Sequence, residues 1–290
     1  MKTITVIGPG LIGGSAALDL RKAGFASHFI GVEQNPENAA KAVELGIVDQ
    51  VLPLEEAAAL SDVILVAIPV TAIQKLLPSL LDLVPPQTVV IDLGSTKTLL
   101  CQAVQQHPKR AQFVAAHPIA GTENSGPLAA LQGLYQGKMN IICEKELSSA
   151  QALATALDLF TTLGLKTIFM QPQEHDKHVA YISHLSHVSS FLLGLTVLDV
   201  EKDEKNIFTL AGSGFASTVR LAKSSPDMWA PIFEQNAHFL SHALGEYIKH
   251  LQQFQHHLQH GETEQLYQMM TQANQIRPVL DGITQTPPAK

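Results

Sequence analysis

A short apolar segment that runs directly into a glycine-rich turn constrains the fold of this chain more than any other feature. Thr3–Ile7 has the β-branched pattern of a buried strand, and the turn Gly8-Pro9-Gly10-Leu11-Ile12-Gly13 follows at once and opens a helix-like stretch. Such a turn between a strand and a helix is typical of a dinucleotide-binding unit. Gly8 permits the tight turn, Gly10 lets a pyrophosphate approach the backbone, and Gly13 lets helix and strand pack closely. The free N–H groups at the start of the helix would bind the phosphates.

An acidic residue, Glu33, ends the next predicted strand, after Gly31-Val32. Its carboxylate can accept hydrogen bonds from both hydroxyls of an adenine ribose, but it would repel a 2′-phosphate, and Gln34-Asn35-Pro36 offers no arginine. The sequence therefore favours NAD over NADP, although Glu33 could also be a solvated residue at a strand end. The predicted cofactor-binding residues are Gly8, Gly10, Leu11, Ile12, Gly13, Glu33 and Pro69.

Short β-branched runs alternate with helix-like stretches through the first half of the chain. This alternation predicts an α/β domain over residues 1–171, with a Rossmann-type doubly wound parallel sheet. The expected strands are Ile4–Ile7, Phe29–Val32, Val63–Ile68, Thr88–Ile91, Gln112–Ala115, Asn140–Cys143 and Lys166–Phe169.

The character of the sequence changes after Gln171-Pro172, where β-branched runs give way to apolar residues at helical spacing. Residues 172–290 are therefore predicted to form an all-α C-terminal domain. One long helix is expected from Pro226 to His260, and a last one from about Glu262 to Leu280. A helical domain appended to a nucleotide-binding sheet often packs against its twin, so we expect a homodimer through this domain.

The composition of the chain narrows the functional classes. Its 290 residues suffice for two domains, and 46% hydrophobic against 16% charged residues excludes a disordered chain. A formal net charge of −7 gives no overall attraction for nucleic acid or an anionic membrane.

Cys101 and Cys143 are the only cysteines, which favours a reducing compartment. The start of the chain lacks the apolar core of a signal peptide, and apolar runs such as Val63–Ile68 are far shorter than the ~20 residues of a membrane helix. We therefore expect a cytoplasmic protein.

A polar segment with a histidine follows the expected strand that ends at Ala115. His117-Pro118 leads into Ile119-Ala120-Gly121-Thr122-Glu123, at the edge of the sheet where open α/β sheets bind ligands. A histidine with a pKa near 6.5 can accept a proton at neutral pH. The loop Gly94-Ser95-Thr96-Lys97 ends another strand and would line the same crevice. These residues indicate an active site, although His117 could instead cap a turn.

Histidines are concentrated in the second half of the chain, with ten of the 13 at or after His175. Some are spaced to share a helix face, as zinc ligands do, for example His184 and His187. However, no HExxH sequence occurs and no acidic third ligand is obvious. We predict no metal site.

Several of these motifs occur together in one family. The glycine turn, the Gly94–Lys97 loop and the segment HPIAGTENSG resemble the prephenate/arogenate dehydrogenase family of tyrosine biosynthesis, most closely prephenate dehydrogenases. In the helical half, Ser183–His187 resembles the family's SHLPH element, and Ala211–Arg220 resembles its AGGGFxDxTR element. Trp229 falls at the family's tryptophan. The sequence departs from the family at Ser186, Ser213 and Ser217, which replace proline, glycine and aspartate; the last change removes a charge near Arg220 and puts details of substrate contact in doubt.

The resemblance assigns a role to each matching residue. It implies that His117 hydrogen-bonds the ring hydroxyl of the substrate and that Ser95 orients both groups. It further implies that His187 and Arg220 contact the substrate and that Glu123 lies near the mouth of the pocket. Arg220 also stands out among the four arginines, because it alone follows a Gly-Ser-Gly turn and lies among small and apolar residues. We expect it to bind a carboxylate in a charge-assisted pair shielded from water, although it could be a surface arginine.

The implied reaction is the NAD-dependent oxidative decarboxylation of prephenate to 4-hydroxyphenylpyruvate and CO₂. Arogenate, the amino counterpart, is the alternative substrate, and the motifs lean only slightly toward prephenate. Two further alternatives are a β-hydroxyacid dehydrogenase or imine reductase, and a non-catalytic NAD-sensing protein. The sequence leaves open inhibition by tyrosine and whether Arg220 serves its own subunit or a partner's.

Overall fold

The computed structural model describes residues 2–203 and 206–284 of the chain. It divides after Ala237 into two compact units, Met1–Ala237 and His238–Lys290. The first unit contains the sheet and the helices up to α10 (Pro226–Gln235). The second contains all but the first residue of α11 (Ala237–Gln259), followed by α12 (Thr263–Ala273) and α13 (Arg277–Thr284).

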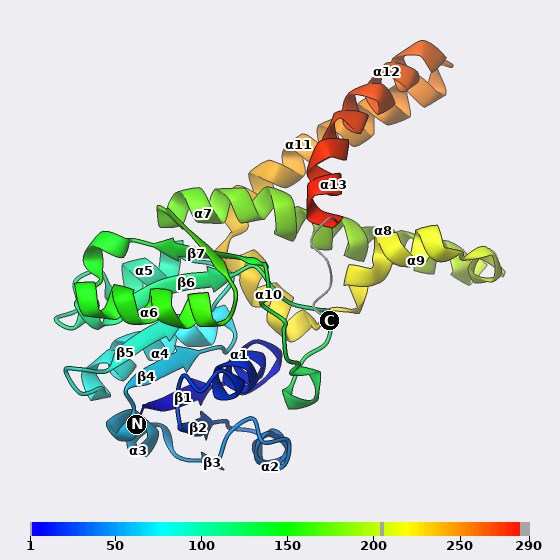
Figure 1. Ribbon diagram of the computed structural model, residues 1–290. Coiled ribbons are helices and arrows are strands. Elements are labelled where there is room, and N and C mark those ends of the chain that lie inside the picture. The colour runs from blue at the N-terminus through cyan, green and yellow to red at the C-terminus, as the bar shows by residue number, and fades with distance from the viewer. Residues whose placement is uncertain (1, 204–205, 285–290) are drawn as a thin grey trace. The chain divides into compact units, whose positions relative to one another are not determined.

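An eight-stranded sheet in the order β3-β2-β1-β4-β5-β6-β7-β8 forms the centre of the first unit (Figure 1). Neighbouring strands are parallel except β6 and β7, which are antiparallel. The predicted doubly wound α/β fold is therefore confirmed, with one antiparallel step. The strands are β1 (Thr3–Ile7), β2 (His28–Val32), β3 (Gln50–Val51), β4 (Val63–Val66), β5 (Val89–Asp92), β6 (Phe113–Pro118), β7 (Met139–Cys143) and β8 (Lys166–Met170).

Two details of the strands differ from expectation. The edge strand β3 has only two residues, too few to produce a recognisable pattern in the sequence. Strand β6 continues to Pro118, so His117 lies within the strand instead of after it. The antiparallel step arises because the connection from β6 to β7 contains only a 3₁₀ turn, Pro127–Ala129, and no crossover helix.

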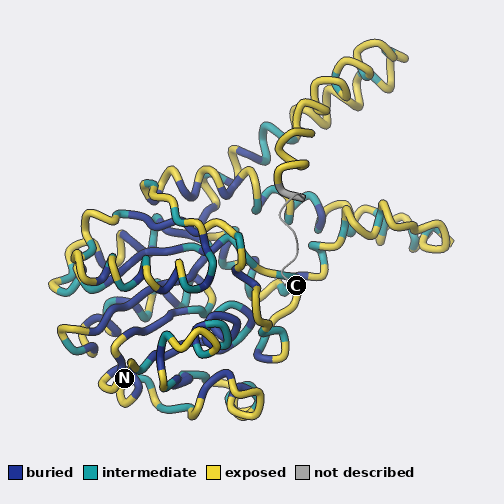
Figure 2. The backbone as a smooth tube through the Cα atoms, viewed as in Figure 1, coloured by how far each residue is buried: buried dark blue, intermediate teal, exposed yellow. Residues whose placement is uncertain are grey.

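Helices cover both faces of the sheet, which explains why its strands are apolar throughout. Neighbouring residues Ile64 and Leu65 of β4 are both fully buried, yet they belong to different core clusters. The strands appear as a buried layer between the helices in Figure 2. Side chains of α1 (Leu11–Lys22), α2 (Pro36–Glu44) and α6 (Ala150–Thr162) fill one cluster; those of α3 (Leu54–Leu60), α4 (Val70–Leu83) and α5 (Thr98–Val104) fill the other.

A long helical stretch follows the last strand. It consists of α7 (Pro172–Val179), a π-helical turn (Ala180–His184) and α8 (Leu185–Asp203), and α9 (Ser213–Val219) follows. Residues Pro172–Lys202 have the length and mean hydropathy of a membrane-spanning helix, contrary to the expectation that no apolar run reaches that length. A helix whose apolar face packs against protein can have the same length and mean hydropathy. These two properties alone therefore do not define a membrane span.

The single helix predicted from Pro226 to His260 is wrong. Two helices, α10 and α11, occupy this segment, and Asn236 separates them with φ −106° and ψ 21°. The side chain of Asn236 is buried and hydrogen-bonded to the π-helical segment, so a tertiary contact fixes the break. The last predicted helix is likewise divided, because a 3₁₀ turn, Asn274–Ile276, lies between α12 and α13.

Candidate active site

A cavity of about 720 Å³ opens at the carboxyl ends of β1 and β4. Strand β1 lies between β2 and β4, so the chain order reverses here, and open α/β sheets bind nucleotides at such a point. Six of the seven predicted cofactor residues line the cavity: Gly8, Gly10, Leu11, Ile12, Glu33 and Pro69. Gly13, the seventh, is buried in the first turn of α1.

The glycine turn has a backbone that other residues would disrupt. Gly8 has φ +84°, and a Cβ on it would lie 2.6 Å from the carbonyl oxygen of Ala67. A Cβ on Gly13 would lie 2.4 Å from the carbonyl oxygen of Gly8, so helix α1 could not pack as closely on the strand. Around Gly10 the nearest atom to such a Cβ is 3.7 Å away, which leaves the backbone open to a ligand. The turn therefore fits the pyrophosphate of a dinucleotide.

Glu33 lies where it can bind a ribose. One carboxylate oxygen accepts a hydrogen bond of 2.9 Å from the N–H of Asn35, which orients the side chain at the cavity wall. Among the described residues that line the cavity there is no lysine or arginine to bind a 2′-phosphate. These features fit NAD better than NADP.

The loop after β5 brings Ser95 to the same cavity. The carboxylate of Asp92, at the end of β5, holds the start of this loop. It accepts a hydrogen bond of 2.7 Å from the N–H of Gly94 and forms a fully buried ion pair with Lys97. Strands β5 and β6 are neighbours, with Asp92 paired to Ala115, so Ser95 and His117 follow adjacent strand positions at one edge of the sheet. Within the described part of the chain, the Ser95 hydroxyl forms no hydrogen bond.

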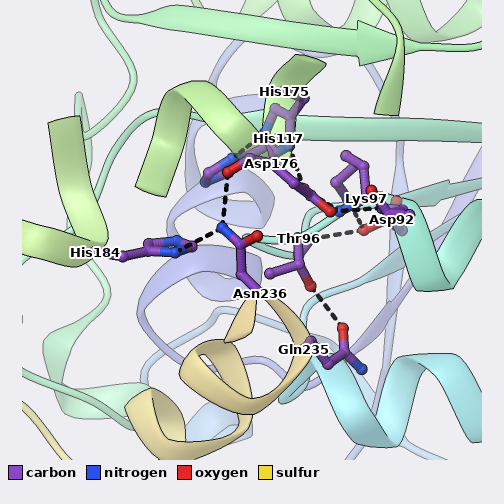
Figure 3. Close-up of polar contacts among 11 residues, drawn as sticks. Asp92, Thr96, Lys97, His117, His175, Asp176, His184, Gln235 and Asn236 are labelled. Atoms are coloured by element: carbon purple, nitrogen blue, oxygen red, sulfur yellow. Dashed lines mark hydrogen bonds and ion pairs between the residues drawn. The ribbon is translucent and has the colours of Figure 1, made fainter. Parts of the chain in front are cut away.

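His117 begins a line of hydrogen bonds into the protein (Figure 3). Its Nδ1 lies 2.8 Å from Nε2 of His175, whose Nδ1 lies 2.8 Å from the carboxylate of Asp176. That carboxylate also accepts hydrogen bonds of 2.8 Å from the backbone N–H groups of Lys97 and Thr98. Helix α7 supplies His175 and Asp176, and both side chains are buried.

Burial controls the protonation of this group. It lowers the pKa of His117 well below its usual value, and a proton on His175 or the charge of Lys97 acts in the same direction. Burial also lowers the pKa of His175, although the hydrogen bond to Asp176 opposes that shift. For Asp176, burial would raise the pKa, but hydrogen bonds from His175 and Thr98 outweigh it and lower the pKa. At neutral pH the group consists of two neutral histidines and one carboxylate.

His187 lies on the face of Trp229. Their ring centroids are 3.4 Å apart with 23° between the planes, and Nδ1 of His187 donates a hydrogen bond of 3.0 Å to the carbonyl of Ser183. Burial lowers the pKa of His187, and the nearby charge of Arg220 lowers it further. The stacked indole and the hydrogen bond fix the orientation of the imidazole.

Arg220 and Glu123 form an ion pair, with 2.7 Å between Nη1 and Oε2. This pair joins the turn after α9 to the segment after β6, so the structure brings two predicted substrate-binding residues together. The side chain of Arg220 is 51% exposed, so the expected shielding from water is wrong for the single chain. Arg220 is the C-cap residue of the short helix α9.

Sequence reasoning assigned no role in the site to His175, Asp176 and Asn236. Asn236 donates hydrogen bonds to the carbonyl oxygen of Asp176, at 2.7 Å, and to Nδ1 of His184, at 3.0 Å. The adjacent titratable residues His175 and Asp176 were visible in the sequence, but nothing local indicated that His175 contacts His117, which is 58 residues away in the chain. Among residues 2–203 and 206–284, no group of three or more histidine, cysteine or acidic side chains is placed to hold a metal ion.

A cavity at the reversal of an α/β sheet, a neutral histidine at the carboxyl edge of the same sheet and an appended helical segment together define a Rossmann-type dehydrogenase. Two family profiles match the chain: "Prephenate dehydrogenase, nucleotide-binding domain" over residues 16–169 and "Prephenate dehydrogenase, dimerization domain" over residues 171–272. The chain therefore belongs to the prephenate dehydrogenase family.

Individual relatives agree with this assignment. Prephenate dehydrogenase of Bacillus subtilis is 29% identical over 97% of this chain and 76% of its own length. The crystal structure of prephenate dehydrogenase from A. aeolicus, in complex with hydroxyphenyl propionate and NAD+, has a TM-score of 0.88 and is 30% identical, with 97% of this chain and 98% of that chain covered. Arogenate dehydrogenase of Synechocystis has a TM-score of 0.75 and is 28% identical, with coverage of 96% and 99%.

Proposed function

We propose that this protein catalyses the NAD-dependent oxidative decarboxylation of prephenate to 4-hydroxyphenylpyruvate and CO₂, a step of tyrosine biosynthesis. The observation that carries the proposal is a neutral, partly buried His117 at the carboxyl end of β6, beside β5, whose following loop brings Ser95 to the nucleotide cavity. The similarity to a prephenate dehydrogenase with bound NAD+ and hydroxyphenyl propionate supports it.

The cofactor would be held by the chain's own turn and carboxylate. Backbone N–H groups of Gly10, Leu11 and Ile12 at the start of α1 bind its pyrophosphate, and Glu33 binds the adenine ribose. Pro69, at the start of α4, forms another part of the cavity wall. Bound NAD+ supplies a hydride acceptor.

His117 is the proposed proton acceptor. It accepts a hydrogen bond from the ring hydroxyl of prephenate, which raises electron density on the carbon that loses hydride. The ring carboxylate leaves as CO₂, and the electron pair of the broken C–C bond completes the aromatic ring. The hydroxyl proton that His117 draws toward Nε2 in the transition state returns to the oxygen of the phenol product, so His117 ends the reaction neutral. Assistance of this kind contributes roughly 10²–10⁴-fold to a rate.

The other residues orient the substrate. Arg220 and His187 bind the two carboxylates, Ser95 orients the ring hydroxyl against His117, and Glu123 positions the guanidinium of Arg220. A planar guanidinium pairs with a carboxylate through parallel hydrogen bonds, so Arg220 contributes mainly to substrate affinity.

A parallel assay tests the reaction. The purified protein is given NAD+ with prephenate, arogenate or a 3-hydroxy acid, and NADH formation is followed by absorbance. We expect turnover with prephenate above the other two substrates. Turnover with arogenate alone would make the protein an arogenate dehydrogenase, whereas NAD+ binding without turnover on any substrate would contradict an enzymatic role.

Assembly, domain boundaries and location complete the proposal. The chain comprises a dinucleotide-binding domain of residues 1–171 and a helical domain of residues 172–290, and it forms a homodimer through the helical domain. The match to a dimerization domain supports this, as does a set of exposed apolar side chains on and after α8: Leu192, Leu193, Leu195, Leu198, Val200, Phe208 and Leu210. The buried free thiols Cys101 and Cys143 suit the cytoplasm.

Sedimentation analysis checks the dimer. Leu195→Asp should shift the protein toward the monomer, because a charge would be buried in the interface. Leu60→Asp, on an equally exposed leucine of α3, serves as the control and should leave the dimer intact. A monomeric wild-type protein would contradict the proposal.

A further inference from the structure

The side chains behind His117 determine which of its nitrogens carries the proton. Both carboxylate oxygens of Asp176 accept hydrogen bonds from backbone N–H groups, Oδ1 from Lys97 and Oδ2 from Thr98. Oδ1 also lies 2.8 Å from Nδ1 of His175. A carboxylate only accepts hydrogen bonds, so Nδ1 of His175 must carry a proton.

The same reasoning extends one ring further. A neutral imidazole has one proton, so Nε2 of His175 is bare once Nδ1 is protonated. Nε2 of His175 lies 2.8 Å from Nδ1 of His117 and can only accept there, so Nδ1 of His117 is the donor. The remaining nitrogen of His117, Nε2, is then unprotonated and available to a substrate hydroxyl.

We propose that His175 and Asp176 are positioning residues, which hold His117 in the tautomer with a bare Nε2 and stabilise the positive charge that its ring gains during the reaction. The inference rests on the proposed function of His117 as proton acceptor. As the substrate hydroxyl donates to Nε2, the Nδ1–H bond of His117 polarises toward His175, and the carboxylate of Asp176 balances the charge at the far end.

The surroundings keep this line of groups rigid. His175 and Asp176 are almost fully inaccessible to solvent, so bulk water does not compete for their hydrogen bonds. Asn236 binds the carbonyl oxygen of Asp176 and thereby anchors α7 at this point. The charged and titratable groups that act on the two histidines, besides Asp176, are Lys97, Asp92 and His184. Lys97 and Asp92 neutralise each other as an ion pair, so Asp176 is the carboxylate that sets the direction of the hydrogen bonds.

Two substitutions of one residue separate a positioning role from a packing role. His175→Phe keeps an aromatic ring but cannot accept a hydrogen bond from His117. His175→Gln places an amide oxygen near the former Nε2 and restores the acceptor. His178→Phe, on the exposed face of the same helix, is the matched control.

Turnover is the first measurement. We expect His175→Phe to lower kcat by about tenfold or more, with smaller changes in KM for prephenate and in NAD+ affinity, because general-base assistance depends on the correct tautomer. His175→Gln should recover most of kcat, and His178→Phe should match the wild type. Asp176→Asn should also lower kcat. Both carboxylate oxygens of Asp176 accept hydrogen bonds, so the NH₂ group of an asparagine would face an N–H donor and disturb the hydrogen bonds that orient His175. The acid limb of the pH profile of kcat should shift in Asp176→Asn and stay in place in His178→Phe.

The tautomer itself is the second measurement. Two-bond ¹H–¹⁵N correlation spectra of ¹⁵N-histidine-labelled protein distinguish a proton on Nδ1 from one on Nε2, and His117→Asn identifies the signals of His117. We expect His117 to be protonated on Nδ1 in the wild type and in His175→Gln, and to lose this preference in His175→Phe. This readout remains decisive if a variant is poorly folded, because the wild-type spectrum alone gives the tautomer.

The outcomes distinguish failure of this inference from failure of the proposed function. If His117 carries its proton on Nε2 in the wild type, or if His175→Phe turns over like the wild type while His117→Asn does not, the positioning role is wrong. If His117→Asn itself turns over normally, the proposed function of His117 is wrong, whatever the tautomer.

Discussion

Arg220 donates a hydrogen bond of 2.7 Å to the carboxylate of Glu123, although 97 residues separate them. The pair joins the helical segment after α9 to the loop that follows His117. It places the guanidinium close to the segment that follows His117, as the proposed binding of a substrate carboxylate requires.

Replacing this arginine should weaken substrate binding. We expect Arg220→Ala to raise KM for prephenate by roughly tenfold to a hundredfold, the loss of one charge-assisted pair, with nearly unchanged NAD+ affinity. Steady-state kinetics and a NAD+ titration measure both quantities. Lys166→Ala, an exposed cation of β8, is the control and should change neither. An equal loss of NAD+ affinity would contradict the role assigned to Arg220.

The proton acceptor should govern turnover instead of binding. We expect His117→Asn to lower kcat by about a hundredfold or more while KM changes modestly, because the hydrogen bond that His117 accepts from the substrate hydroxyl strengthens as hydride leaves. The measurement is kcat at saturating prephenate and NAD+. Near-wild-type turnover would remove His117 from this role.

Cofactor preference should depend on the carboxylate at the end of β2. We expect Glu33→Ala to lower NAD+ affinity and to narrow the preference for NAD+ over NADP+ by about tenfold, because the variant loses a ribose hydrogen bond and a repulsive charge. Fluorescence titration with both cofactors gives the ratio. Glu37→Ala, an exposed acid in the first turn of α2, is the matched control. An unchanged ratio in Glu33→Ala would show that Glu33 does not contact the ribose.

The stability of the protein should fall in mild acid. Burial lowers the pKa of His184 from 6.5 to about 4, so the unfolded chain takes up a proton between these values that the folded chain resists. As the pH falls from 6.5 toward 4, this group should therefore lower the free energy of unfolding by up to about 3 kcal/mol. Urea denaturation at several pH values measures the slope.

A pair of glutamine variants isolates this contribution. His184→Gln should be less sensitive to acid than the wild type, whereas His178→Gln, at an exposed position, should keep the wild-type slope. Equal slopes in all three proteins would mean that His184 titrates normally in the folded state.

Local sequence determined much of the first half of the molecule. Each predicted strand is present, because a strand buried on both faces must be apolar along its length and this pattern is visible in the sequence. The glycine turn was equally clear, since the positive φ of Gly8 and the close packing of Gly13 exclude other residues. His117 could be placed at the sheet edge because strand ends fix that edge.

Tertiary structure decided the remaining features. The sequence could not indicate that His117 contacts His175, or that Asp176 accepts the N–H groups at the start of α5, because residues far apart in the chain meet only when α7 docks beside the sheet. The sequence also predicted one helix where the structure has two, α10 and α11, separated at Asn236. This break depends on a buried contact between Asn236 and His184 and not on local propensity. The sequence therefore predicted individual residues of the site, such as His117 and Ser95. Their hydrogen-bonding order, which sets the tautomer of His117, exists only in the folded chain.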